Sequence, residues 1–280
     1  MIYFCADDYG LCDSVNLHIQ QCIDGGTLNK VSVFPNFDAV DLRKFNPDTR
    51  ISLHLNLVEG KCLSKAEEID LLADKNGNFK HTFFGLFKLW LFQPKKLEAQ
   101  LYKEIKLQVL CWRRALPEGV DFCIDSHQHT HMLPPVFNAL LQVLKDEKMN
   151  IEYMRIPAEP ILPYLKAPSL YFTYSPVNLI KQWLLKFLWL CNKRKAKHIK
   201  KAYFMGILFS GKMDEKRVLK ILPAYEKLAR KTGADIEVLF HPGFIEQEKE
   251  IENIVFPKFY FSENRKTEFD SVKKIAERSV

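Results

Sequence analysis

The feature that most constrains this fold is the regular alternation of short apolar, β-rich runs with longer segments of helical periodicity. Most of the apolar runs are apolar on both faces, which is typical of strands covered on both sides in a parallel sheet. The seven strand candidates are residues 1–6, 30–34, 50–55, 121–126, 151–156, 202–209 and 236–241. Helical patterns cover about residues 14–24, 94–115, 134–148, 177–195, 214–231 and 266–278.

Alternation of this kind predicts parallel strands joined by right-handed helical crossovers. Such strands form either a doubly wound sheet or a (β/α) barrel. Neither of the glycine-rich phosphate-binding motifs follows the first strand, so the pattern does not indicate a nucleotide-binding sheet. We therefore expect a single α/β domain over residues 1–280, a distorted TIM-like (β/α) barrel of about seven parallel strands.

The distribution of charge indicates possible binding partners, and the cysteine content indicates the cell compartment. Much of the net charge of +7 lies in "KRKAKHIKK", residues 193–201, which could bind an anionic membrane or nucleic acid, or form a solvated helix end. We expect no nucleic-acid partner. The seven cysteines form no C-x-x-C pair, which favours a reducing compartment. Residues 1–10 lack the pattern of a signal peptide, and we expect a cytoplasmic protein.

Polar residues gather where the predicted strands end. In parallel α/β folds the carboxyl ends of the strands share one face, and active sites form there. Residues more than 230 positions apart can therefore meet at that face. The strand-end residues are Asp7, Asp8, His54, Asp125, His127, Arg155 and His241.

The adjacent carboxylates Asp7 and Asp8 indicate a cation site. Two carboxylates in a confined space repel each other, and a divalent cation can take one as a ligand and leave the other free as a base. Two imidazoles and one carboxylate form a set with open positions for water and substrate. Asp8, His54 and one histidine of "HQHTH" (127–131) supply that set. Taken alone, the acidic pair could instead be a charge pair at a helix start, and His54 a core histidine.

Three neighbouring residues have more than one interpretation. Asp125 either orients a ligating histidine, with His127 close by, or caps the turn. His129 and His131 share a face with His127 if the strand continues, whereas a turn after Ser126 would separate them. Arg155 orients Asp7, binds a substrate oxygen, or forms a structural ion pair.

Five ordered blocks resemble the motifs of the YdjC-like carbohydrate deacetylases, a family that includes chitooligosaccharide deacetylases and proteins linked to hopanoid biosynthesis. The blocks are "CADDYG" (5–10), "SLHLNLVEG" (52–60), "DSHQHTHMLP" (125–134), "RIP" (155–157) and "EVLFHPGF" (237–244). The resemblance implies a barrel-like fold and metal-dependent removal of an acetyl group from an N-acetylated sugar.

The same resemblance implies a role for each matching residue. The metal ligands fall on Asp8, His54 and His127, the catalytic base on Asp7, and the acid on His241. Asp125, His131 and Arg155 are then expected beside the substrate or behind the ligands. The cofactor would be one divalent ion, Mg²⁺ or Zn²⁺ first and Mn²⁺ or Co²⁺ as alternatives.

Two insertions, at about residues 82–116 and 160–201, contain unusually apolar stretches interrupted by lysines. Neither stretch has the ~18 uninterrupted apolar residues of a membrane span. Lys88, Lys181 and Lys186 interrupt them at spacings typical of helices that lie in a membrane interface. A homodimer interface or a lid over the barrel mouth is the alternative. The sequence thus leaves open a peripheral contact with the inner face of the membrane.

Two rival functions remain at this level. Another barrel metallohydrolase, such as a phosphoesterase, could use the same Asp and His set, although a two-metal site would require further ligands. The second rival is a membrane-associated carbohydrate-binding protein that has the same fold but an inactive site. The intact set of strand-end residues favours the N-deacetylase.

Overall fold

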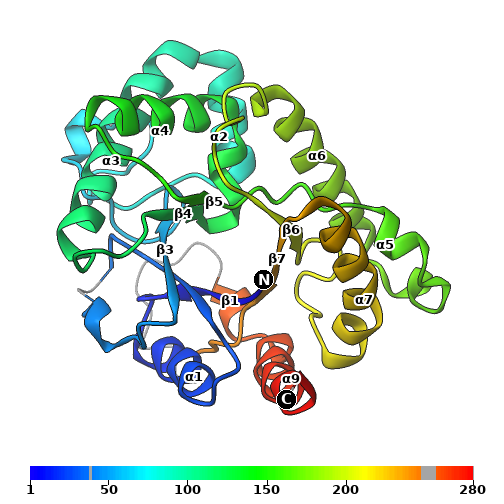
Figure 1. Cartoon of the computed structure of the whole chain (residues 1–280). Coiled ribbons are helices and arrows are strands. Elements are labelled where there is room, and N and C mark those ends of the chain that lie inside the picture. Colours follow the sequence, from blue (N-terminus) through cyan, green and yellow to red (C-terminus); the bar gives the residue numbers. More distant parts are fainter. Residues whose placement is uncertain (38–39, 247–256, 280) are drawn as a thin grey trace.

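The computed structural model describes residues 1–37, 40–246 and 257–279 (Figure 1). A parallel sheet has the strand order β5-β4-β3-β2-β1-β7-β6. Its strands are β1 (Ile2–Tyr9), β2 (Lys30–Val33), β3 (Arg50–Leu55), β4 (Cys123–Ser126), β5 (Tyr153–Met154), β6 (Ala202–Met205) and β7 (Asp235–Phe240). All six neighbouring pairs are parallel. The predicted parallel strands are confirmed.

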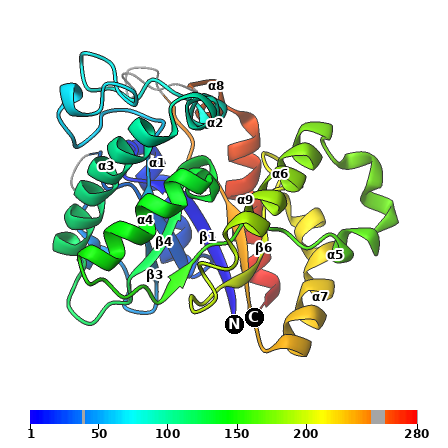
Figure 2. The same cartoon turned by 90° about the horizontal axis from the view of Figure 1, so that it is seen from above.

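The sheet curls into a barrel-like wall. Its two edges approach each other at a bridge between Tyr153 and Lys200, where the Met154 N–H donates to the Lys200 carbonyl at 3.1 Å. The helices lie around the outside of this wall (Figures 1 and 2). The predicted TIM-like α/β fold in a single domain is confirmed.

The helices follow the predicted pattern, with some additions. They are α1 (Asp13–Asp24), α2 (Phe83–Phe92), α3 (Pro94–Ala115), α4 (Pro134–Asp146), α5 (Leu162–Leu165), α6 (Pro176–Asn192), α7 (Glu215–Thr232), α8 (Pro257–Tyr260) and α9 (Glu263–Ser279). Short 3-10 turns are η1 (Leu42–Lys44), η2 (Ala66–Glu68), η3 (His127–Met132) and η4 (Pro168–Thr173). Local chemistry sets several ends: Pro94 starts α3, and the Asp214 carboxylate caps α7 by accepting from the Arg217 N–H.

Two strands, β5 and β6, are each four residues shorter than predicted. Residues 206–209 leave β6 because the carboxylate of Glu159 accepts the N–H groups of Gly206 and Leu208, both at 2.8 Å. β5 stops three residues before Pro157, which has no N–H to donate to a neighbouring strand.

The inside of the barrel is charged. Lys30, Asp125, Arg155 and Glu237 are fully buried and come from four different strands or strand ends. Lys30 Nζ lies 2.9 Å from Glu237 Oε1, and Arg155 Nε lies 2.6 Å from the same oxygen. The apolar core therefore lies mainly between the sheet and the helices, and the interior carries the polar residues that support the strand ends.

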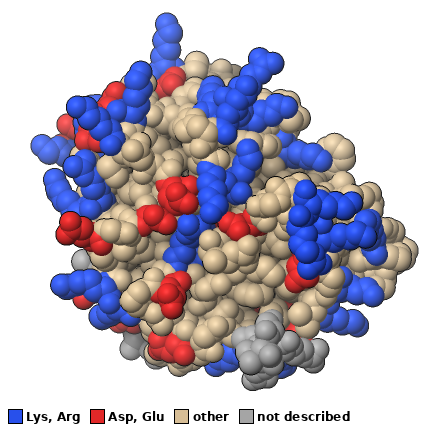
Figure 3. All heavy atoms as spheres, in the orientation of Figure 1, with Lys and Arg blue, Asp and Glu red and all other residues tan. Residues whose placement is uncertain are grey.

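The outer surface reflects the basic composition. Lys and Arg side chains outnumber Asp and Glu on the face drawn in Figure 3, in agreement with the net charge of +7. Across the described ranges, no helix is both long enough and apolar enough to cross a bilayer.

Candidate active site

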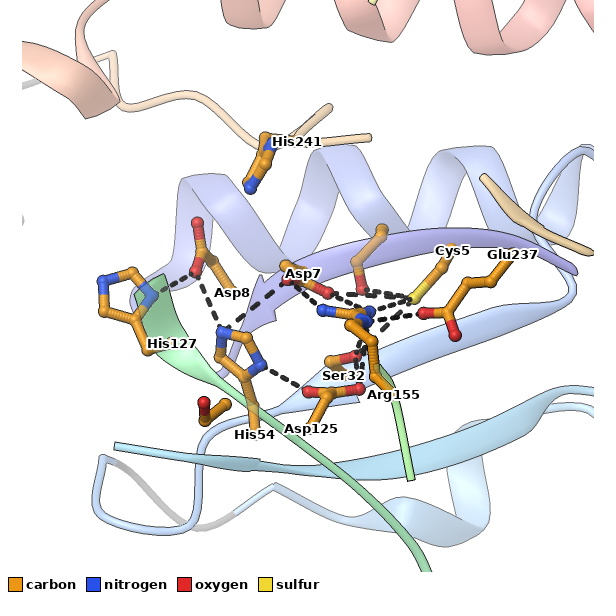
Figure 4. A network of polar contacts seen from close by, with 12 residues as sticks. Cys5, Asp7, Asp8, Ser32, His54, Asp125, His127, Arg155, Glu237 and His241 are labelled. Atoms are coloured by element: carbon orange, nitrogen blue, oxygen red, sulfur yellow. Dashed lines mark hydrogen bonds and ion pairs between the residues drawn. The ribbon is translucent and has the colours of Figure 1, made fainter. Parts of the chain in front are cut away.

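The two adjacent carboxylates reach the same site because β1 carries a bulge. The β1–β2 register shifts between Ala6 and Tyr9, so one extra residue of β1 is accommodated there. Asp8 has a φ of 74°, in the left-handed region that few residues other than glycine adopt. In a regular strand, consecutive side chains point to opposite faces. The bulge turns both Asp7 and Asp8 toward His54 (Figure 4).

His54 is held by Asp125 from the neighbouring strand. The two residues are register partners on β3 and β4, and His54 Nδ1 lies 2.6 Å from Asp125 Oδ1. This leaves His54 Nε2 facing Asp8 Oδ1 at 3.5 Å and Asp7 Oδ2 at 3.9 Å. Burial opposes charge on this ring, but Asp7, Asp125 and Asp8 together raise the pKa of His54 to about 10. The sequence prediction placed Asp125 behind His127, whereas its histidine partner is His54.

The histidine run does not continue as a strand. After β4 the chain enters η3, in which Gln128 and His129 have φ values of 51° and 57°. This turn separates the three histidines. His127 Nδ1 lies 3.0 Å from Asp8 Oδ1, and the edge of the His129 ring packs against Phe204.

His131 is directed away from the acidic pair. Its Nε2 lies 2.8 Å from the Arg155 carbonyl, and its Nδ1 is hydrogen-bonded to Ser126 Oγ. Burial lowers the pKa of His131 to about 4, so this ring is neutral near pH 7. With both ring nitrogens engaged, His131 connects β4 to the segment after β5.

Arg155 fixes the orientation of Asp7. Its guanidinium donates to Asp7 Oδ2 at 2.7 Å and to Asp7 Oδ1 at 2.8 Å. Burial alone would raise the pKa of Asp7, but Arg155 and then His54 outweigh it and leave that pKa below its usual value. Of the three roles considered for Arg155, its contacts match two: the orientation of Asp7 and a structural ion pair, here with Glu237.

His241 follows β7 directly and lies on the same side as the acidic pair (Figure 4). Its backbone N–H donates to Glu268 Oε2 at 2.6 Å, and its Nδ1 lies 3.6 Å from the same oxygen. Its side chain is 15% exposed, more than the side chains of Asp8, His54 or His127. His241 therefore lies where the site opens toward solvent.

Three ligand atoms fit a metal ion. Asp8, His54 and His127 each offer one ligand atom, and these three atoms lie within 4.8 Å of one another. Asp8 Oδ1 lies 3.5 Å from His54 Nε2 and 3.0 Å from His127 Nδ1. Asp8 Oδ1 and His54 Nε2 are both buried, and within the described residues neither has a partner in hydrogen-bond geometry, although both histidine nitrogens lie this close to Asp8 Oδ1. A buried oxygen and nitrogen without such partners are costly unless a ligand binds them. A second group, Asp7, His54 and Asp125, fits less well because Arg155 and His54 already bind its carboxylates.

Several residues at the site carried no local signal in the sequence. Arg265 of α9 donates to Asp8 Oδ2 at 2.5 Å and to the Gly243 carbonyl at 2.5 Å. The Tyr260 hydroxyl lies 3.4 Å from His127 Nε2. Lys30 and Glu237 could have been noticed as charges inside apolar strand runs, but Arg265 lies in an ordinary charged helix.

Several known proteins are similar in sequence to this chain. A relative from Danio rerio named carbohydrate deacetylase is 33% identical over 162 residues, 56% of this chain and 50% of that protein. One of the same name from Thermoanaerobacter pseudethanolicus is 27% identical and covers 56% of this chain and 61% of that protein. The aligned part thus spans about half to three fifths of these two relatives. A third, from Mus musculus, is 26% identical over 85% of this chain and 76% of that protein.

A solved structure supports the fold. It is described as a candidate cellobiose-phosphate cleavage protein from Enterococcus faecalis V583. It superposes with a TM-score of 0.64 and 16% identity, covering 100% of this chain and 95% of that one. The family described as YdjC-like protein matches residues 1–276. The five motif blocks and this match over nearly the whole length agree: the chain belongs to the YdjC-like family.

Proposed function

We propose that this protein is a metal-dependent hydrolase that removes the acetyl group from an N-acetylated carbohydrate. Relatives named carbohydrate deacetylase support the substrate class. The observation that carries the proposal is the group of buried Asp8, His54 and His127 beside an ionised, oriented Asp7. This arrangement supplies both a cation site and a base, which amide hydrolysis by water requires.

Asp8, His54 and His127 would hold one divalent ion. When bound, such an ion acidifies a water molecule and polarises an amide carbonyl. Asp125 supports His54 as a ligand, because its bond to Nδ1 leaves Nε2 directed at Asp8. Two imidazoles and a carboxylate suit Zn²⁺ and Co²⁺, and also Mn²⁺ or Mg²⁺ when water molecules complete the shell.

Asp7 is the proposed base. Arg155 holds both of its oxygens, so the carboxylate is ionised and cannot rotate freely. Its Oδ2 faces His54 and is the atom that accepts the proton released by the attacking water. Bonds to Arg155 make Asp7 a weaker base, and its orientation compensates for part of that loss.

His241 is the proposed acid. Cleavage of the amide C–N bond leaves an amine nitrogen that needs a proton, and the exposed side of the site is where a sugar amine would depart. Glu268 Oε2 lies 3.6 Å from His241 Nδ1, on one side of the ring. The products are acetate and a free amino sugar.

The cysteines support the proposed cytoplasmic location. All seven lie within the described residues and none of them forms a disulfide bond, and Cys5, Cys22 and Cys123 are buried. Cysteines outside disulfides in these numbers are typical of proteins from reducing compartments.

The test is acetate release from N-acetylglucosamine oligosaccharides, phosphosugars and lipid-linked sugars, after removal of metal and addition of single metals. We expect one metal ion per chain, and activity that Asp7→Asn lowers at least about 100-fold without removing the metal. His54→Ala should remove both metal and activity. Asp13→Asn, an exposed carboxylate at the start of α1, is the matched control and should change neither.

Two results would contradict the proposal. Phosphate release without acetate release would indicate a phosphoesterase. Unchanged metal content in His54→Ala would show that the ion is bound elsewhere.

A further inference from the structure

The outward face of α6 is apolar. Val177, Ile180, Trp183, Phe187 and Leu190 are each between 53% and 67% exposed. They recur every three or four residues along the helix and therefore form one continuous stripe. A helix on the surface of a globular protein normally turns polar residues to solvent. This stripe, the α6 surface, does the reverse.

The opposite face of α6 packs against the protein, so the exposed stripe is not a core-facing surface of a misplaced helix. Its buried residues include three amides, Asn178, Gln182 and Asn192. Gln182 donates to the Glu159 carbonyl at 2.9 Å, and Asn192 donates to the Met132 carbonyl at 2.8 Å. The helix is thus oriented by specific hydrogen bonds that leave the apolar stripe outside.

Positive charges border the α6 surface. On a helical projection, with about 100° per residue, the exposed Lys181 and Lys186 fall on opposite sides of the stripe. Directly after α6, residues 193–201 contain six Lys or Arg. Lys and Arg side chains gather around the part of the molecule in Figure 3 where Figure 1 draws α6 and the following segment. Apolar residues flanked by lysines are typical of helices that lie in the interface of an anionic membrane.

The preceding segment adds to the apolar surface. α5 and η4 lead directly into α6 and lie on the same side of the molecule in both views (Figures 1 and 2). They expose Leu162 and Leu165 by more than half, and Phe172 completely. A phenylalanine that protrudes fully from a short turn has no packing role within the fold and is suited to insertion between lipids.

We propose that the α6 surface, together with α5 and η4, docks the protein on membranes that contain anionic lipids. Apolar side chains enter the interfacial region, and Lys181, Lys186 and the basic segment contact lipid phosphates. A second copy of the chain is a poorer occupant. A symmetric pair of α6 surfaces would bring the lysine borders and the two +7 molecules together, which costs electrostatic free energy.

Docking would hold the candidate active site close to the membrane. α6 packs against η3, the turn that begins with His127. The docking surface does not depend on the proposed deacetylase activity, and binding is measured separately from acetate release. The two proposals can therefore fail independently.

The test is flotation of the full-length protein with vesicles of phosphatidylcholine alone or with about one third phosphatidylglycerol. We expect binding to the anionic vesicles that weakens as salt rises. Trp183→Ser with Phe187→Ser should lower the partition coefficient at least about tenfold, and Lys181→Gln with Lys186→Gln should lower it severalfold. Leu17→Ser, which removes an equally exposed apolar side chain from α1, is the matched control and should bind as the wild type does.

Folding of each variant is checked by its thermal melt, and the lysine pair is informative even if the Trp183 and Phe187 variant is unstable. Failure of the wild type to bind either vesicle would overturn the proposal. So would binding that neither variant reduces. A concentration-dependent dimer in sedimentation that Trp183→Ser abolishes, without vesicle binding, would show that a second copy covers the surface.

Discussion

At the scale of single residues, Arg155 has the most demanding position in the structure. It is fully buried and contacts the carboxylates of Asp7, Asp125 and Glu237. With Lys30, it supplies the positive charge that offsets these three groups inside the barrel. Buried charges are tolerated only when they are paired and hydrogen-bonded, so the three carboxylates depend on Arg155 and Lys30 together.

Arg155→Lys tests whether the planar fork of arginine is needed or only its charge. Lysine keeps the positive charge but cannot bind both oxygens of Asp7 at once. We expect acetate release to fall at least about tenfold, because Asp7 loses its fixed orientation. Loss of one hydrogen bond also raises the pKa of Asp7, so the acidic limb of the pH–rate profile should move to higher pH.

The control for this change is Arg50→Lys, which alters an arginine that meets Asp121 and Glu152 near the surface. This control should leave the acidic limb in place. An unchanged limb in Arg155→Lys itself, despite lower activity, would mean that Asp7 is not the titrating base.

At the scale of elements, one buried carboxylate joins three segments of the barrel wall. Glu159 accepts the N–H groups of Gly206 and Leu208 and the hydroxyl of Tyr164, and it has no exposed surface. Burial raises the pKa of Glu159, although the donors around it act in the opposite direction. This contact ties the segment after β5 to α5 and to the end of β6.

Glu159→Ala would leave these donors without an acceptor inside the protein. We expect a loss of about 2–4 kcal/mol in the free energy of unfolding, since each unsatisfied buried donor costs roughly 1–3 kcal/mol. Urea unfolding measures the change. Glu118→Ala, at an exposed position before β4, should cost less than about 0.5 kcal/mol and serves as the control. A similar small loss for Glu159→Ala would show that water replaces the carboxylate.

The strands and turns also show which features of the fold and the site could be predicted from the sequence. The strands are short apolar runs separated by strong helical patterns, so their number and parallel orientation followed from periodicity. The strand-end position placed Asp8, His54 and His127 on one face. Three features did not follow: the bulge that turns Asp7 and Asp8 to the same side, the left-handed residues in η3, and the pairing of Asp125 with His54. Each depends on contacts between strands that no local pattern records.

At the scale of the whole molecule, the first strand and α9 meet at the site. Asp8 lies on the first strand, and Arg265 lies on the last helix, 257 positions later. The amino group of Met1 also pairs with Asp235 at the start of β7, at 2.7 Å. β1 lies between β2 and β7 in the sheet, and α9 packs against β7 and α1, which brings Arg265 to Asp8. The negative charge of Asp8 is thus balanced by Arg265 of α9 as well as by His54 and His127.

This arrangement predicts that a bound metal ion and Arg265 both neutralise the negative charge of Asp8. Burial would raise the pKa of Asp8, but Arg265 and then His127 lower it well below its usual value. In metal-free protein, Arg265→Gln should destabilise the fold by roughly 3 kcal/mol, because it removes one partner of a buried ion pair. That loss corresponds to a fall in melting temperature of roughly 6–10 °C.

A bound divalent ion would supply positive charge to Asp8 and stabilise the native state. The loss caused by Arg265→Gln should therefore be at least halved when the melt is repeated with saturating metal in place of chelator. Arg217→Gln, which breaks an ion pair with Asp214 at the start of α7, lies away from the site and should cost the same with metal and with chelator. Equal losses for Arg265→Gln under both conditions would mean that the ion does not bind Asp8, since only an ion on that carboxylate can replace the guanidinium.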